Sequence, residues 1–77
     1  MGIEKNVDPL DRLIGRNIRL NRIRKGWSQL DLGERIGVSY QQVQKYETAA
    51  NRIAASRLIH IARALEVPIN ALLFCGD

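Results

Sequence analysis

The stretch SQLDLGERIGVSYQQVQKYE, residues 28–47, decides the fold of this 77-residue chain. Each half begins with a serine, Ser28 or Ser39, and carries an acidic or amide residue three positions later. This spacing is typical of a capping box, in which the serine accepts a backbone hydrogen bond at the start of a helix. Between the halves, Gly37 can adopt the left-handed backbone conformation that ends a helix. The stretch therefore predicts two short helices joined by a tight turn.

The apolar residues of this stretch lie at helical spacing and indicate how the two helices pack. The residues that we expect to face inward are Leu32, Ile36, Val38, Val43 and Tyr46. Gly33, on the inner side of the first helix, leaves room for a close approach of the second. Two short helices held at a fixed angle around a glycine-containing turn make a helix-turn-helix.

The sequence before and after this stretch predicts three further helices. One begins at Pro9, with Asp8 as its N-cap, and runs to about Lys25. The others cover about 55–66 and the short segment INALLF that follows Pro68. No run of alternating apolar and polar residues predicts a strand. The expected fold class is therefore all-α, with five short helices.

Length and composition indicate a single small globular domain, because 45% of the residues are hydrophobic. We expect this domain to cover 8–74, with a flexible tail at 1–7 and a second tail at 75–77. We expect no signal peptide, and no apolar run in the sequence approaches the about 20 residues that span a bilayer. The single cysteine, Cys75, can form neither an internal disulfide nor a metal site. We therefore expect a cytoplasmic protein without metal or other cofactor.

Positive charge is concentrated in the first third of the chain. Residues 1–27 hold seven Lys or Arg against three Asp or Glu, and this excess equals the formal net charge of +4. From Ser28 onward the two signs balance. A clustered excess indicates either a polyanionic partner or a solubilising surface, and charge alone does not decide between them.

The second helix of the motif has a polar face that carries no acidic residue. With Val43, Tyr46 and Glu47 inward, four residues point outward. They are Tyr40, Gln41, Gln44 and Lys45. Gln can bond adenine in bidentate fashion, Lys can donate to guanine, and Tyr can contact a thymine methyl group or a phosphate. Solvated helix faces are usually rich in Glu and Lys, so this composition favours a face that reads base edges.

Polar residues beside this face are suited to the phosphate backbone. The unpaired N–H groups at the starts of both helices attract anions, and Gln29 and Ser39 lie there. Asn51 and Arg52 lie in the loop that follows. Contacts of this kind fix the register of a protein on DNA and carry no sequence information themselves.

Two segments carry a family resemblance: IRLNRIRKGWSQLDLGERIGVSYQQVQKYE and NRIAASRLIHIARALEVPINALL. They resemble the Cro/cI-type, or Xre-like, helix-turn-helix regulators over about residues 14–74, and QQVQKYE with NRI and ASRL is especially similar to an alphaproteobacterial branch. The resemblance implies a compact five-helix, phage-repressor-like domain. Such domains bind double-stranded operator DNA, usually as two-fold dimers, with the third helix in the major groove. The implied base contacts are Tyr40, Gln41, Gln44 and Lys45, and the implied phosphate contacts are Ser28, Gln29, Asn51 and Arg52.

The chain departs from the family pattern at two positions. The family usually has Gly two residues after the Glu of the third helix, and here that position is Ala49. The next helix is often preceded by Pro, where this chain has Ile53. We expect Ala49 to change how the third helix ends and how the loop meets phosphate.

Two charged residues fall on apolar stripes. Arg22 follows Ile18 by four positions in the first helix, and Glu47 follows Val43 by four in the third. Burying either charge alone would cost several kcal/mol, so we expect Arg22 and Glu47 to pair. The family often has an Arg–Glu pair at these positions. The alternative is that both side chains extend to solvent.

Some apolar residues fall outside the face expected to pack inside the domain. Ile53 lies in a loop and Ile59 lies off the apolar stripe of its helix, which indicates a second surface to bury. The candidate residues of a two-fold dimer interface are Ile53, Ile59, Ile69, Leu72 and Phe74. Single exposed apolar residues are also common without any interface.

The sequence therefore predicts a DNA-binding transcriptional regulator, favouring a repressor that binds operator DNA as a homodimer. The alternative is a protein-interaction module such as the antitoxin of a toxin–antitoxin pair. An enzyme is disfavoured, because the sequence has no nucleophile–base pair and no metal cluster, and a domain this small leaves little room for a small-molecule pocket.

Overall fold

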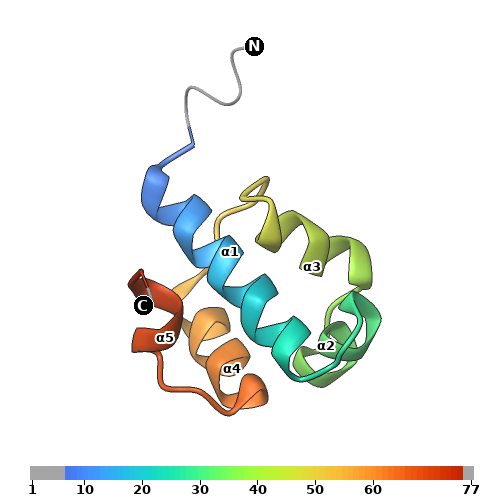
Figure 1. The fold of residues 1–77 in the computed structure, drawn as a ribbon. Helices are drawn as coiled ribbons and strands as arrows, with labels where there is room; N and C mark the ends of the chain where they lie inside the picture. Colours follow the sequence, from blue (N-terminus) through green and yellow to red (C-terminus); the bar gives the residue numbers. More distant parts are fainter. Residues whose placement is uncertain (1–6, 76–77) are drawn as a thin grey trace.

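The computed structural model describes residues 7–75 as helices packed about a long first helix (Figure 1). In chain order they are α1 (Pro9–Arg24), α2 (Gln29–Ile36), α3 (Tyr40–Glu47), α4 (Ala55–Leu65) and α5 (Asn70–Leu73). These residues contain no strand, so the predicted all-α class is confirmed. No helix among them is long and apolar enough to cross a membrane. Of the predicted tails, only Val7 and Cys75 belong to the described part.

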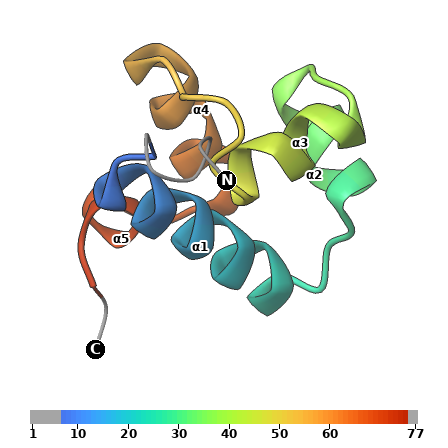
Figure 2. The same cartoon turned by 90° about the horizontal axis from the view of Figure 1, so that it is seen from above.

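The helices lie on two sides of α1. Helix α5 packs against one side of α1 and α3 against the other, while α2 contacts α3 and α4. Figure 2 shows this division, with α5 at one side of α1 and the pair α2 and α3 at the other. Every helix contributes at least one fully buried side chain to the core. These side chains are Ile18, Leu32, Val43, Ile61, Leu65 and Leu72.

Serine side-chain caps fix the starts of α2 and α3. At α2 the capping box is complete: Ser28 Oγ accepts from the Asp31 N–H at 3.0 Å, and Asp31 Oδ2 accepts from the Ser28 N–H at 2.8 Å. The backbone bond from Ser28, together with its hydroxyl, lowers the pKa of the Asp31 carboxyl. At α3, Ser39 Oγ accepts from the Gln42 N–H at 3.1 Å. Among the described residues Gln42 returns no bond to Ser39, so the second predicted capping box is only half formed.

The turn between α2 and α3 is built on two glycines. Gly37 ends α2 in the left-handed conformation, with φ 78° and ψ 32°, as predicted. A Cβ on Gly33 would lie 2.5 Å from the carbonyl oxygen of Val38. Because Gly33 has no side chain, the backbone of the turn can pack directly against α2 at Val38. This close contact fixes the angle between α2 and α3.

A third glycine, which the sequence analysis did not single out, allows α3 to contact α1. A Cβ on Gly15 would lie 2.6 Å from the backbone oxygens of both Tyr46 and Glu47. The last turn of α3 therefore rests directly on the backbone of α1. No local sequence signal marks such a contact, because its two sides are about 30 residues apart.

Asn17 attaches α5 to α1. This residue is buried, and its Nδ2 donates to the carbonyl oxygens of Leu72 at 3.1 Å and Phe74 at 2.9 Å. Those carbonyls belong to the C-terminal end of α5 and have no partner within so short a helix. Asn17 is thus a polar core residue with a structural task that its sequence neighbourhood does not reveal.

Candidate nucleic-acid interface

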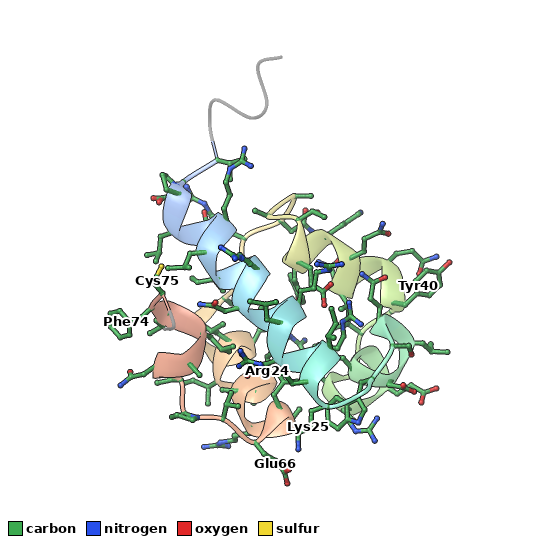
Figure 3. The ribbon with its side chains drawn as sticks, viewed as in Figure 1. Arg24, Lys25, Tyr40, Glu66, Phe74 and Cys75 are labelled. Atoms are coloured by element: carbon green, nitrogen blue, oxygen red, sulfur yellow. The ribbon has the colours of Figure 1, made fainter. Side chains whose placement is uncertain are left out.

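Helix α3 divides into a buried face and a polar face. Val43, Tyr46 and Glu47 are buried, as predicted. The four candidate base-contacting residues are all exposed. They are Tyr40, Gln41, Gln44 and Lys45. Figure 3 shows Tyr40 extending into solvent from the start of α3. Their exposure agrees with the sequence, and their contact with bases stays a prediction.

A buried ion pair fixes α3 to α1. Arg22 Nε lies 2.6 Å from Glu47 Oε2 and Arg22 Nη2 lies 3.0 Å from Oε1, so the predicted pair is present and bidentate. The two side chains are 10% and 2% exposed. Arg22 Nη1 also donates to the Trp27 carbonyl oxygen at 2.8 Å. Because the charges are paired and hydrogen-bonded, the cost of burying them is offset and the orientation of α3 is fixed.

Gln29, a candidate phosphate contact, joins the same network. Its Nε2 donates to Glu47 Oε1 at 3.2 Å. One amide hydrogen is thereby used. Within residues 7–75 the amide oxygen and the second hydrogen have no partner, so both can bond another group. Gln29 is half-buried at the first position of α2. The start of α2 and the end of α3 are therefore connected through a side chain.

The loop after α3 begins with a strained residue. Ala49 has φ 63°, the left-handed conformation that the expected glycine would adopt easily. Ala49 donates its N–H to the Tyr46 oxygen at 3.2 Å, and Ala50 donates to the Lys45 oxygen at 2.9 Å. The alanine thus makes the left-handed turn itself, at a cost of about 1–2 kcal/mol for an L residue.

We expect Ala49→Gly to raise the free energy of unfolding by about 0.5–1 kcal/mol, because relief of the strain outweighs the extra chain entropy of glycine. Urea unfolding measures this change. Ala50→Gly is the matched control, because Ala50 is the next residue of the same loop but has no positive φ. This control should lose stability, and a loss in both variants would contradict a strained Ala49.

The candidate phosphate contacts of the loop, Asn51 and Arg52, are exposed. Arg52 Nε lies 3.4 Å from Asp11 Oδ2, with the arginine side chain 81% exposed. A pair this exposed is weak. Arg52 can therefore exchange its carboxylate partner for a phosphate at little cost. Ser28 and Ser39, the other candidates, are exposed at the two helix starts.

The residues predicted for a dimer interface differ in their exposure to solvent. Leu72 is completely buried, so its assignment to an interface is wrong: the packing of α5 on α1 turns this side chain into the core. Ile53 and Ile69 are partly buried against the core. Ile59 and Phe74 are exposed, at 44% and 60%.

Two contacts that hold α2 in place were not foreseen from the sequence. The Arg35 guanidinium lies 3.9 Å from the centre of the Trp27 ring, a cation–π contact beside the start of the helix. Arg57 of α4 donates to the carbonyl oxygen of Ile36 at the other end of α2. Arg35 is exposed and Arg57 is half-buried, and the sequence pattern gives no sign of a partner for either.

The basic residues of α1 serve different purposes. Arg22 is in the buried pair, and Lys25, which directly follows the helix, pairs with Glu66. The hydrogen bond from Lys25 lowers the pKa of the Glu66 carboxyl. The other arginines of α1 are exposed: Arg12, Arg16, Arg19 and Arg24. The charge excess of the sequence is therefore mostly solvent-facing.

Comparison with known proteins places this geometry in a family. The model of the helix-turn-helix family matches residues 18–72. A relative from Sinorhizobium medicae (strain WSM419), named an uncharacterized HTH-type transcriptional regulator, is 46% identical over 67 residues. The alignment covers 87% of this chain and 48% of the relative, so the chain spans about half the relative's length.

Solved structures share the fold. The hypothetical transcription factor NHTF from Neisseria has a TM-score of 0.80 at 35% identity, covering 84% of this chain and 73% of that protein. The P22 c2 repressor, solved in complex with a synthetic operator, has a TM-score of 0.74 at 29% identity. That match covers 84% of this chain and 97% of the repressor chain. The chain therefore belongs to the Cro/cI-type helix-turn-helix family that its sequence resembles.

Proposed function

We propose that this domain binds double-stranded operator DNA and regulates transcription, with α3 lying in the major groove. The observation that carries the proposal is the outer face of α3. Every exposed side chain of Tyr40–Glu47 can serve base readout, and none is acidic. The P22 c2 repressor, whose fold is similar, is solved with an operator. The relatives from several alphaproteobacteria are named HTH-type transcriptional regulators.

The contacts divide into two kinds. Tyr40, Gln41, Gln44 and Lys45 contact base edges. Ser28, Gln29, Ser39, Asn51 and Arg52 contact phosphates on either side of the groove. The exposed helix starts of α2 and α3 support the second assignment, because their N–H groups favour anions. Most of the affinity then comes from phosphate neutralisation and decreases with salt, while the sequence preference comes from α3.

The protein acts as a repressor in the cytoplasm, on the nucleoid, and binds DNA as a homodimer. Exposed Ile59 on α4 supports a second surface to bury. A two-fold dimer requires an operator with two inverted half-sites about one helical turn, 34–36 Å, apart. Selection from a random pool of double-stranded DNA tests DNA binding and dimerisation together: a symmetric consensus is expected, an asymmetric one contradicts the dimer, and no enrichment contradicts DNA binding.

Lys45→Ala and Arg52→Ala should weaken DNA binding in different ways. Lys45→Ala is expected to cost about 1–3 kcal/mol on the selected operator and to relax the preference at one base position. Arg52→Ala should weaken all sequences about equally and reduce the salt slope by about one. Anisotropy titrations of operator and random duplexes at several salt concentrations measure both effects.

His60→Ala, an exposed change on α4, is the control for these titrations and should leave affinity unchanged. The assignment of α3 is contradicted if Lys45→Ala leaves operator and random DNA equally unaffected. The assignment of the loop to phosphate is contradicted if Arg52→Ala changes the preferred sequence.

A further inference from the structure

A groove of about 660 Å³ lies between α1 and α5, on the side of α1 away from α3. Figure 3 shows Phe74 and Cys75, which line it, at the opposite side of the molecule from Tyr40. The proposed DNA contacts therefore leave this groove open. The side chain of Phe74 is 60% exposed, so this apolar wall of the groove faces solvent.

The walls of the groove are fixed in place. Asn17, at its floor, donates to the Leu72 and Phe74 carbonyl oxygens and so holds α5 against α1. Asn21 Nδ2 donates to the backbone carbonyl oxygen of Asn17 at 2.8 Å, one turn earlier in α1. A binding partner therefore meets a preformed surface, and little conformational entropy is lost in ordering that surface on binding.

The lining combines apolar side chains with cations. Leu13, Leu20 and Phe74 supply partly exposed apolar surface. Arg16 and Arg24 are exposed, and within residues 7–75 neither has an ion-pair partner. None of the lining residues is acidic. Such a surface is complementary to an apolar strip flanked by carboxylates.

We propose that this groove binds an amphipathic helix of a protein partner, with acidic residues beside its apolar face on the side that meets Arg16 and Arg24 of α1. Helix α1 has 16 residues and is about 24 Å long, which suits a helix of similar length lying along it. A second copy of this chain is a poor occupant, because a two-fold contact would place Arg16 and Arg24 against the same arginines. This assigns Phe74 to the groove rather than to the dimer surface.

Two synthetic helical peptides with the same leucine face test the proposal, one flanked by glutamates and the other by lysines. With the full ¹⁵N-labelled chain, the glutamate peptide should shift amide resonances along Leu13–Arg24 and around Phe74, and the lysine peptide should not. In Arg16→Glu/Arg24→Glu the glutamate peptide should bind at least about tenfold more weakly, and the lysine peptide should now bind.

Arg12→Glu/Arg19→Glu is the matched control, because it makes the same charge change on exposed residues of α1 that do not line the groove. It should retain the glutamate peptide. Equal loss in both double variants, or shifts confined to α2 and α3, would overturn the proposal. So would competition by a DNA or RNA oligonucleotide at these resonances, or movement of the same resonances with protein concentration alone.

Discussion

Arg22→Met and Glu47→Leu are each expected to lower the free energy of unfolding by about 3–5 kcal/mol, because each leaves a buried charge without its partner. The remaining group loses two short hydrogen bonds, and in Glu47→Leu the amide of Gln29 also loses its acceptor. A loss of this size is a large part of the stability of so small a domain. Guanidinium unfolding followed by circular dichroism measures it at low temperature.

The double variant Arg22→Met/Glu47→Leu is expected to be more stable than either single variant, because it removes both buried charges together. Lys25→Met is the control: it breaks the solvent-exposed pair with Glu66 and should change stability little. Additive losses in the double variant would mean that the two charges do not depend on each other, contrary to the geometry.

Gly15→Ala is expected to lower the free energy of unfolding by about 1–3 kcal/mol, the usual cost of overpacking. At an ordinary helical site the same change would stabilise by up to about 1 kcal/mol. Here the new methyl group meets two backbone oxygens at 2.6 Å, and backbone cannot move aside as a flexible side chain can. Helix α3 must shift away from α1.

Urea unfolding measures the effect of Gly15→Ala, and DNA titration reports the shift of α3 as weaker operator binding. Arg19→Ala is the matched control, since it places the same residue on the exposed side of α1 and should change stability little. A stabilised Gly15→Ala variant would contradict the close contact between α1 and α3.

The sequence predicted those parts of the fold whose causes are local. Serines with an acidic or amide residue three positions later, and Gly37 after an apolar run, determine helix ends within a few residues, so α2 and α3 are read from the sequence. The docking of α5 was not foreseen, because it depends on Asn17 reaching carbonyls 55 and 57 positions away. That same contact explains why Leu72 was wrongly assigned to a surface.

In the candidate site, too, the features with a local sequence signal were predicted and those that depend on distant contacts were not. Arg22 and Glu47 were found from the sequence because a charge on an apolar stripe is costly and demands a partner. The polar face of α3 was found because it lacks the acidic residues of an ordinary solvated face. The contacts of exposed Arg35 and half-buried Arg57 were not found, because an arginine off the apolar stripe of its helix is stable without a specific contact. The groove beside α5 was missed because the packing of α5 against α1 was not foreseen.

The bond between Gln29 and Glu47 has a consequence for which DNA sequences the domain accepts. It joins the proposed phosphate contact at the start of α2 to the end of α3, through the network around the buried Arg22–Glu47 pair, which resists deformation. The spacing between the proposed phosphate contact and the proposed base contacts is therefore set by the protein. DNA whose groove must widen or bend to match that spacing binds more weakly, because its distortion costs free energy. The flexibility of base pairs that the protein never touches then contributes to its choice of operator.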